Sequence, residues 1–464
     1  MKKRVTALLL CLVMPFSLFL ATGCWGGNRR PDHFVMAIFQ GGYGREWADE
    51  LARRFEAETG NLVEVRADAG IIARMETELV HGGGADLYFS HGIPWESFAV
   101  RNLLLPLDDL YNSTVENNVT FRDRVIESAI PYSRFNNRYY KVPWTQGVGG
   151  IAFNVGMFRA NGWAIPQTYD QLITLTNTIR DAQIPAPGSR DGFVRPFVWP
   201  GLNQYLWDYV VYEWWAQLEG TSRVRELMSF SHGADTFNPN THWSGMRDAF
   251  GAWHNLIAAT PANSISDSNG MTAFSAQAAF INGHAAMMPS AHWLYNEVRE
   301  RAPIGFEMAI MSTPTLANAR PGYEQVNYLV GFGDSAVIPR NALNPDIAKD
   351  FLRFMAREDN VLLFKELTRG AHLAFNYPVI SDDDQYNTFT QSVNEKLRDS
   401  RNFHVYSSHH MAVFLHETLM VWPENDYFYV LAFNDPAIFT PQAVFHGIHQ
   451  NVLNNWHIWE MAAQ

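Results

Sequence analysis

The sequence predicts an α/β protein with two lobes. At 464 residues the chain is longer than a single hydrophobic core usually supports. Near the N-terminus, apolar runs of strand length alternate with helical periodicity, which favours a parallel sheet covered by helices. The stretch 139–154, YYKVPWTQGVGGIAFN, combines Pro143 with three glycines. This composition suits a bent strand that joins the lobes, although a glycine bulge at a sheet edge is the alternative interpretation.

The composition describes a folded, acidic protein. Hydrophobic residues make up 47% of the chain, charged residues 18%, and the formal net charge is −12. We expect no nucleic-acid partner, because no basic cluster follows the first thirty residues. Aromatic residues reach 14%, including 15 Trp, so some indoles could contact a flat, partly apolar ligand such as a sugar. Large cores alone would also account for them.

The first segment has the pattern of an export signal that ends at a lipid-attachment site. Basic residues precede an apolar run over 7–20, which is too short for a membrane-spanning helix. Residues 20–24, LATGC, resemble a bacterial lipobox. We expect residues 1–23 to be removed, Cys24 to be acylated, and residues 24–32 to form a tether. The only other cysteine is Cys11 inside the signal, so no disulfide is expected.

The first lobe is predicted to begin with a βαβ unit. An apolar strand over 33–39 is followed by helical periodicity over 47–55 and by a second strand over 62–66. Another helix and a third strand, near 85–90, come next. Ligands bind at the carboxyl ends of parallel strands, so the loops 40–43 and 90–95 should face one crevice. The glycines of the first loop do not have dinucleotide-binding spacing.

The second lobe is predicted after the bent strand. Thr168 and Gln171 form a capping box that begins a helix. The most aromatic part of the chain, 197–215, follows, and most of its rings should be core. Those nearest the expected turn from strand to helix are candidates for the cleft: Trp199, Asn203 and Tyr205.

Later segments suggest that the chain returns to the first lobe. The range 271–293 reads as a helix ended by Gly283, a strand of small residues and a loop that carries Trp293. The range 327–333 reads as an apolar strand interrupted by glycines, and it is a candidate second crossing between the lobes. A third crossing is expected near 371–378, and the remaining chain should be helical.

These motifs, in this order, resemble the extracellular solute-binding proteins that serve ABC transporters, the group that includes maltose-binding protein. Val142-Pro143 leading to Ala152-Phe153-Asn154 is similar to the first inter-lobe crossing of that family. The run 280–287, FINGHAAM, is similar to its "F-x-x-G-K-A-A-M", with His284 in place of lysine, and 103–108 and 161–172 match further segments. Trp293 stands where family members carry a tryptophan.

The resemblance implies a type II periplasmic-binding-protein-like fold, with two α/β lobes joined by crossing strands around a ligand cleft. Lobe 1 would comprise 33–144 and 332–374, and lobe 2 would comprise 145–331 and 375–464. The implied function is that of a monomeric, membrane-anchored lipoprotein outside the cytoplasm. It would capture a carbohydrate between closing lobes and deliver it to an ABC permease, without catalysis and without a cofactor.

Candidate ligand contacts come from the loops and from the resemblance. The family's third strand end supplies contacts, which points to Ser90 and His91, and its loop tryptophan often stacks on a pyranose. No metal site is expected, because His409 and His410 are adjacent and lack supporting ligands. The complete candidate set is Gln40, Tyr43, Ser90, His91, Trp144, Gln146, Trp199, Asn203, Tyr205 and Trp293.

Two other functions remain open from the sequence. An exported glycan hydrolase would use the same aromatic cleft with two carboxylates at a defined separation, and 47 acidic residues leave that possible. A carrier of peptides or polyamines would have acidic residues lining the cleft in place of neutral amides.

Overall fold

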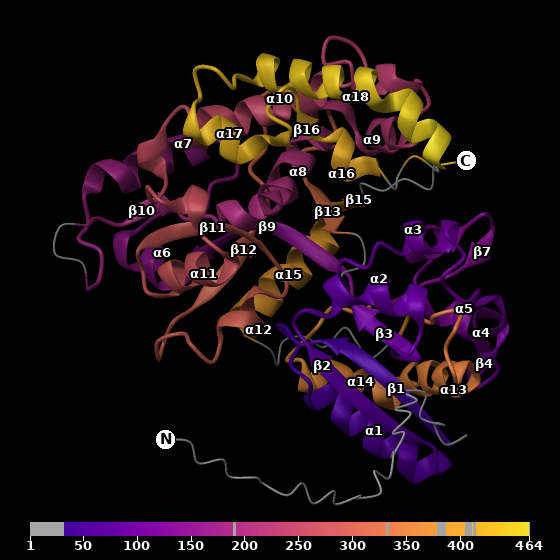
Figure 1. Ribbon diagram of the computed structural model, residues 1–464. Helices are drawn as coiled ribbons and strands as arrows, with labels where there is room; N and C mark the ends of the chain where they lie inside the picture. The colour runs from indigo at the N-terminus through magenta and orange to yellow at the C-terminus, as the bar shows by residue number, and fades with distance from the viewer. Residues whose placement is uncertain are drawn as a thin grey trace, which may run out of the picture.

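The computed structural model describes residues 32–188, 192–330, 334–377, 387–403, 411 and 414–463. The expected signal, Cys24 and the tether up to residue 31 lie outside the described residues. Two lobes, each built on its own sheet, lie next to each other (Figure 1). Within the described ranges, no helix is both long enough and apolar enough to span a membrane.

The sheet of lobe 1 has the strand order β2-β1-β3-β14-β8. β1 pairs in parallel with β2 and β3, which confirms the predicted βαβ unit, while β14 is antiparallel to both β3 and β8. These strands are β1 (His33–Phe39), β2 (Leu62–Asp68), β3 (Leu87–Ser90), β8 (Val142–Pro143) and β14 (Ser335–Val337).

Helices cover both faces of this sheet, which explains why β1 is apolar on both sides. Alternate residues of β1 enter two different cores: Phe34, Met36 and Ile38 pack on one face, and Val35 and Ala37 on the other. The first core includes α1 (Glu46–Thr59), α13 (Pro345–Met355) and α14 (Glu358–Leu367), and the second includes α2 (Ile71–His81) and α3 (Trp95–Val100). The smaller elements are α4 (Asp108–Asn112), β4 (Thr114–Glu116), β5 (Val119–Thr120), α5 (Phe121–Arg124), η1 (Glu127–Ser133), β6 (Arg134–Phe135) and β7 (Arg138–Tyr139).

The sheet of lobe 2 is organised around β9, which is antiparallel to β11, β12 and β13. Its order is β10-β11-β9-β13-β15, with β12 also paired to β9. The strands are β9 (Gly147–Asn154), β10 (Arg195–Phe197), β11 (Ala285–Ala291), β12 (Met308–Met311), β13 (Val326–Val330) and β15 (Arg401–Phe403).

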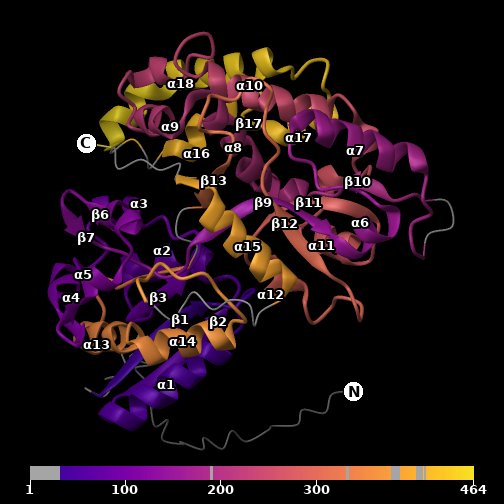
Figure 2. The same ribbon diagram turned by 180° about the vertical axis from the view of Figure 1, so that it is seen from behind.

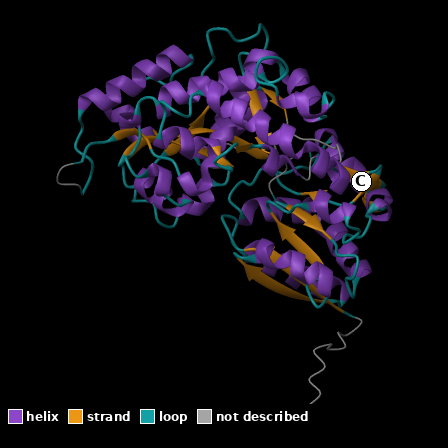
Figure 3. Ribbon diagram, turned by 45° about the horizontal axis from the view of Figure 1, so that its top comes forward, coloured by secondary structure: helices purple, strands orange, loops and turns teal. Residues whose placement is uncertain are grey.

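Lobe 2 is richer in helices than lobe 1, and helices surround the strands in both (Figure 3). The capping box of Thr168 and Gln171 is present at the start of α7, as predicted. The aromatic helix α8 is almost wholly buried, and α18 packs on α10 and η3 along the outer side of the lobe (Figure 1). The helical elements up to residue 270 are α6 (Val155–Asn161), α7 (Tyr169–Ala182), η2 (Gly201–Trp207), α8 (Asp208–Glu219), α9 (Thr221–Met228), η3 (Gly233–Phe237), α10 (Ser244–Trp253), η4 (His254–Ala258), η5 (Pro261–Asn263) and η6 (Ser268–Gly270). The later elements are α11 (Ala273–Ile281), α12 (Leu294–Val298), α15 (Thr388–Asp399), α16 (Leu415–Thr418), β16 (Met420–Val421), β17 (Asp426–Tyr427), α17 (Phe428–Asn434) and α18 (Pro441–Ala463).

The chain passes between the lobes where the sequence predicts its first two crossings. β8 leads into β9, and β13 precedes β14 in the other sheet. Trp144 and Thr145 both donate backbone N–H groups to the Asp334 carbonyl, at 3.0 and 3.1 Å, and the Gln146 N–H donates to the His372 carbonyl at 2.8 Å. The first crossing is therefore hydrogen-bonded to the second crossing and to the segment that leads to the third.

For the third predicted crossing, the structure describes the residues before it, up to 377, and those after it, from 387. Residues 378–386 lie outside the described ranges, and the chain resumes in α15, which packs on β9 and β12 of lobe 2 (Figure 2). All strands of the first sheet fall within 33–144 and 332–374, and all strands of the second within 145–331 and 375–464.

Candidate functional site

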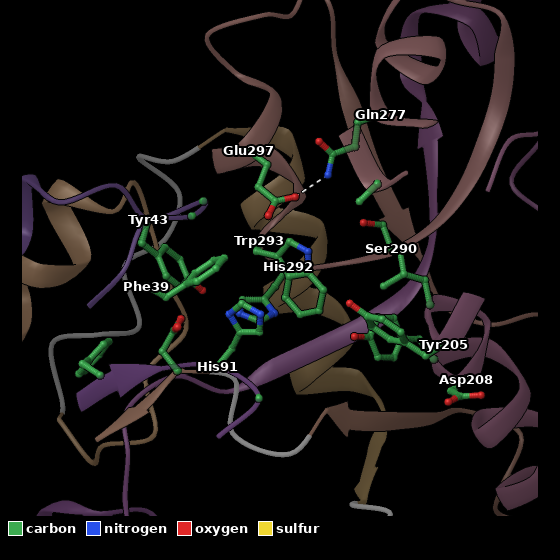
Figure 4. A pocket seen from close by; sticks show the side chains of 18 of the residues that line it. Phe39, Tyr43, His91, Tyr205, Asp208, Gln277, Ser290, His292, Trp293 and Glu297 are labelled. Carbon is green, nitrogen blue, oxygen red and sulfur yellow. Dashed lines mark hydrogen bonds between the residues drawn. The ribbon is translucent and has the colours of Figure 1, made fainter. Parts of the chain in front are cut away.

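A cavity of about 730 Å³ lies between the two lobes (Figure 4). Lobe 1 lines it with the turn after β1, with the end of β3 and with Asp334 beside the second crossing. Lobe 2 contributes the segment 205–209, the beginning of α11, the end of β11, and α12. The loops that follow β1 and β3 face the same cavity, so the prediction that they share one crevice is confirmed.

Aromatic rings form walls on both sides of the cavity. In lobe 2 the half-buried Trp293 meets Tyr209 edge to face, with ring centroids 5.7 Å apart. In lobe 1 Phe39 meets His91 at 4.2 Å in the same arrangement. A glycine in β9 makes room for this packing, because a Cβ on Gly149 would lie 2.4 Å from Tyr209. The absence of a side chain at Gly149 of β9 thus allows the Tyr209 ring to pack beside this strand.

Two buried polar groups at the end of β11 have no partner among the described residues: the Ser290 Oγ and the His292 Nε2. His292 Nδ1 accepts the Val148 N–H at 3.3 Å, so the neutral ring carries its proton on Nε2. Burial lowers the pKa of His292 to about 3, which keeps the ring neutral. Both residues line the cavity and can donate to an oxygen of a ligand.

Three carboxylates also line the cavity, and two of them have protein partners. Asp208 accepts hydrogen bonds from the hydroxyls of Tyr427 and Tyr429, each at 2.9 Å. Burial nevertheless raises the pKa of Asp208 to about 7. Glu297 accepts a hydrogen bond from Gln277 Nε2, and burial raises its pKa as well.

The third carboxylate, Asp334, accepts no hydrogen bond from any residue that the structure describes. Its backbone is fixed, because its N–H donates to Thr145 Oγ1 at 2.8 Å. Burial first, and then the negative charge of Glu297, raise the pKa of Asp334 to about 7. No lysine or arginine belongs to the described lining of the cavity. The site is therefore acidic as well as aromatic.

The lobes touch each other across the cavity. A Cβ on Gly42 of lobe 1 would lie 2.9 Å from Glu297 Cγ and 3.5 Å from the Trp293 carbonyl, both in lobe 2. The rings of Tyr43 and His292 lie 6.3 Å apart between centroids. The turn after β1 therefore rests against α12 of the other lobe.

Four of the ten candidate ligand contacts line this cavity: Tyr43, His91, Tyr205 and Trp293. They come from both lobes, and Tyr205 is 46% exposed.

Two indole candidates require correction. Trp144 and Trp199 have no exposed surface and belong to the cores of lobe 1 and lobe 2, respectively. Trp144 packs edge to face on Phe375 at 4.7 Å, and Trp199 on Phe433 at 5.2 Å. They cannot stack on a ligand in this arrangement.

The other four candidates lie outside the cavity lining. Gln146 Nε2 donates to the Leu373 carbonyl at 2.6 Å, and Ser90 Oγ donates to the His91 carbonyl at 2.9 Å. Asn203 Oδ1 accepts the Ala273 N–H at 3.1 Å, which joins η2 to α11. Gln40 is exposed beside the turn.

Six polar lining residues were absent from the predicted set: Asp208, Gln277, Ser290, His292, Glu297 and Asp334. Ser290 and His292 could have been found, because they sit at the end of the small-residue strand just before Trp293. The three carboxylates carry no local signal, since each belongs to a segment that reaches the cavity only after folding. In the described part of the chain, no three His, Cys, Asp or Glu side chains are grouped to hold a metal ion.

Comparison with known proteins decides the family. The sequence model of the bacterial extracellular solute-binding proteins matches residues 50–373. The chain belongs to this family. Family membership implies a location outside the cytoplasm. A curated relative, the diacetylchitobiose binding protein NgcE of Streptomyces coelicolor, is 23% identical over 342 residues, which are 69% of this chain and 65% of the relative. The matched region thus spans less than two thirds of that relative.

Solved structures of solute-binding proteins have the same fold. The protein is similar to the ABC substrate-binding protein Lmo0181 from Listeria monocytogenes in complex with cycloalternan, with a TM-score of 0.68, 14% identity, and coverage of 92% of this chain and 99% of that one. It is also similar to RafE from Streptococcus pneumoniae, solved in complex with raffinose, with a TM-score of 0.62, 16% identity, and coverage of 90% and 98%. The predicted type II periplasmic-binding-protein-like fold is confirmed.

Proposed function

We propose that this solute-binding protein captures a carbohydrate between its lobes and delivers it to the permease of an ABC transporter, without catalysing a reaction. We further propose that it acts as a monomer anchored through a lipid on Cys24, with the lobe boundaries expected from the sequence. The names of its relatives support the ligand class, since they bind diacetylchitobiose, raffinose and cycloalternan.

One observation carries the proposal: the partly exposed Trp293 indole lies in a cavity that both lobes line. The apolar face of a sugar ring packs well on an indole, while its hydroxyl groups need hydrogen-bond partners at the rim. Ser290 and His292 supply unpartnered donors, and Asp334 supplies an acceptor. This combination of flat apolar wall and convergent polar groups suits a pyranose.

Closure would couple binding to transport. Each lobe provides only part of the lining, so a ligand that touches both walls binds the closed form more tightly than the open form. It therefore shifts the equilibrium toward closure. The permease would recognise the closed form through the surfaces that closure brings together.

A panel of mono- and oligosaccharides tests this function by thermal shift and by calorimetric titration. A bound sugar raises the melting temperature in proportion to its occupancy. W293A should weaken the affinity for any sugar that binds, whereas unchanged affinity would remove Trp293 from the site. If no carbohydrate raises the melting temperature, the proposal fails.

The hydrolase alternative keeps one supporting observation, because Glu297 and Asp334 face the same cavity. Incubating the protein with each oligosaccharide and analysing the products separates the two functions. A carrier returns the sugar intact at one molecule per chain, and turnover would establish an enzyme.

A further inference from the structure

Of the two carboxylates Glu297 and Asp334, only Glu297 has a described cation nearby: the charge of Arg301 opposes the rise that burial causes in the pKa of Glu297. Arg301 lies behind Glu297, where its Nη2 donates to Gln277 Oε1 at 2.7 Å and to the Glu297 carbonyl at 3.0 Å. Its guanidinium lies over the Phe274 ring at 4.0 Å, and it is not part of the lining. The carboxylate of Asp334 has no partner at all among the described residues. Any positive charge that faces Asp334 inside the cavity must therefore come from elsewhere.

The two acids come from separate segments that closure brings together. Asp334 is fixed beside the crossings by its backbone bonds to Thr145, and Glu297 projects from α12, which the Gly42 turn of the other lobe contacts. Closing the lobes removes water from the space between them. Asp334 loses water next to the negative charge of Glu297 without gaining a cation from the described residues, which opposes closure. A ligand cation between the two carboxylates favours closure.

A second, independent observation shows what else the ligand must carry. His292 is 6% exposed, and its Nε2–H has no partner among the described residues. Because Nδ1 is held by Val148 in β9, Nε2 is on the side of the ring that faces away from this strand. This Nε2–H and the buried hydroxyl of Ser290 can both donate to an acceptor oxygen on the ligand. The aromatic rings of the cavity favour a ligand with a flat apolar face.

We propose that the ligand is an amino sugar or a glycan with a free amine, whose ammonium group binds between Asp334 and Glu297 while its ring packs on Trp293. This inference rests on the proposed carbohydrate function. A polyamine supplies the charge but neither the acceptor oxygens nor the ring face. An acidic sugar supplies oxygens and a ring, but the carboxylates repel it.

Matched ligands test the inference by calorimetric titration of the mature chain at pH 7.5. Glucosamine, N-acetylglucosamine and glucose differ only at the C2 substituent, and their β-1,4-linked dimers and the corresponding galacto-series extend the comparison. Within each matched set, the affinity for the sugar with a free amine should be at least about tenfold higher than for its acetylated and hydroxyl counterparts. D334N and E297Q should each remove this preference, so that within each variant the amine member binds no more tightly than its acetylated and hydroxyl counterparts.

Glu300 supplies the control, because it follows α12 closely but its side chain is 84% exposed. E300Q should leave the preference unchanged. If neutral or acetylated sugars bind more tightly than the amines, the inference is overturned while the carbohydrate function stands. The inference also fails, and the carbohydrate function again stands, if the matched sugars do not bind and other uncharged oligosaccharides do. If spermidine or a lysine dipeptide binds and no sugar does, both proposals are overturned.

Discussion

Lys396 and Glu213 form an ion pair at 2.8 Å in which both side chains are buried. Lys396 Nζ also donates to the Gly149 carbonyl at 2.6 Å, and Glu213 accepts the Tyr328 N–H at 2.8 Å. The pair thereby joins α15 and α8 to β9 and β13, the two strands of lobe 2 that lead to the first and second crossings. It fixes the lobe 2 ends of the two crossings.

Removing one partner of this pair should destabilise the protein strongly. K396M leaves the Glu213 carboxylate buried without its cation, so we expect the free energy of unfolding to fall by about 3–5 kcal/mol. The double variant K396M/E213M should recover much of that loss, because two apolar side chains replace both charges. Urea denaturation measures each value. A single variant as stable as the natural protein would contradict the role of the pair.

Trp293 and Trp144 should respond differently to substitution. W293A removes an indole that lines the cavity, so it should weaken sugar binding by about 1–3 kcal/mol and cost little stability. W144A instead opens a hole in the core of lobe 1 and should lower the free energy of unfolding by about 3–5 kcal/mol. Titration calorimetry and denaturation separate the two effects. Equal loss of affinity and stability in both variants would contradict the assignment.

Asp334 should make the stability of the protein fall as the pH rises toward neutrality and above. The pKa of Asp334 rises from 3.8 to about 7 on folding, so the folded state holds a proton that the unfolded state has released. The stabilisation is complete below pH 3.8 and is lost as pH rises through 7. D334N should therefore stabilise the protein at pH 8, by about 2 kcal/mol, and much less at pH 4.5.

Thermal melts of D334N and the natural protein across that pH range check the prediction. Among the described residues, Glu297 and Tyr43 are the titratable groups that interact electrostatically with Asp334, and neither supplies a positive charge. A stabilisation that does not grow between pH 4.5 and pH 8 would show that the carboxylate is not confined in the way the structure describes.

Gly42 should be needed for closure. A Cβ there would approach Glu297 Cγ to 2.9 Å, so G42V should hold the turn away from α12. We expect a larger radius of gyration in the presence of ligand by small-angle scattering, together with an affinity reduced about tenfold. Gly270 is the control, because an added Cβ meets nothing within 4 Å. If G270A and G42V behave alike, the contact is not part of closure.

Cys24 should decide where the protein is found. The natural chain should incorporate radiolabelled palmitate and remain with the membrane fraction. C24S should be exported without the label and appear in the soluble extracytoplasmic fraction. Membrane association that survives this change would exclude the lipid as the anchor.

The order of elements could be predicted because local patterns specify it. Apolar runs, helical periodicity and the capping box at Thr168 depend on neighbouring residues alone, and they gave β1 to β3 and α7 in their correct places. The crossing at 139–154 could be placed because proline restricts the backbone and glycine allows conformations that other residues resist, wherever the chain later packs.

The lining of the cavity depended on contacts between distant segments. Glu297 contacts Gly42, and Asp334 contacts Thr145, although the two residues of each pair are far apart in the sequence. Trp144 and Trp293 have the same side chain at similar strand ends, yet Phe375 covers the first and only the second remains accessible. No pattern around either indole reveals which one a later segment will cover.

The position of β14 has a consequence for how the protein is made. β14 lies between β3 and β8 in the sheet of lobe 1, but its residues leave the ribosome and the export channel after all of β9 to β13. Until then β3 and β8 expose unpaired edges, which invite association with other chains. The nascent polypeptide must therefore be shielded through most of its synthesis, and truncation before residue 335 would leave the amino-terminal half permanently unfinished.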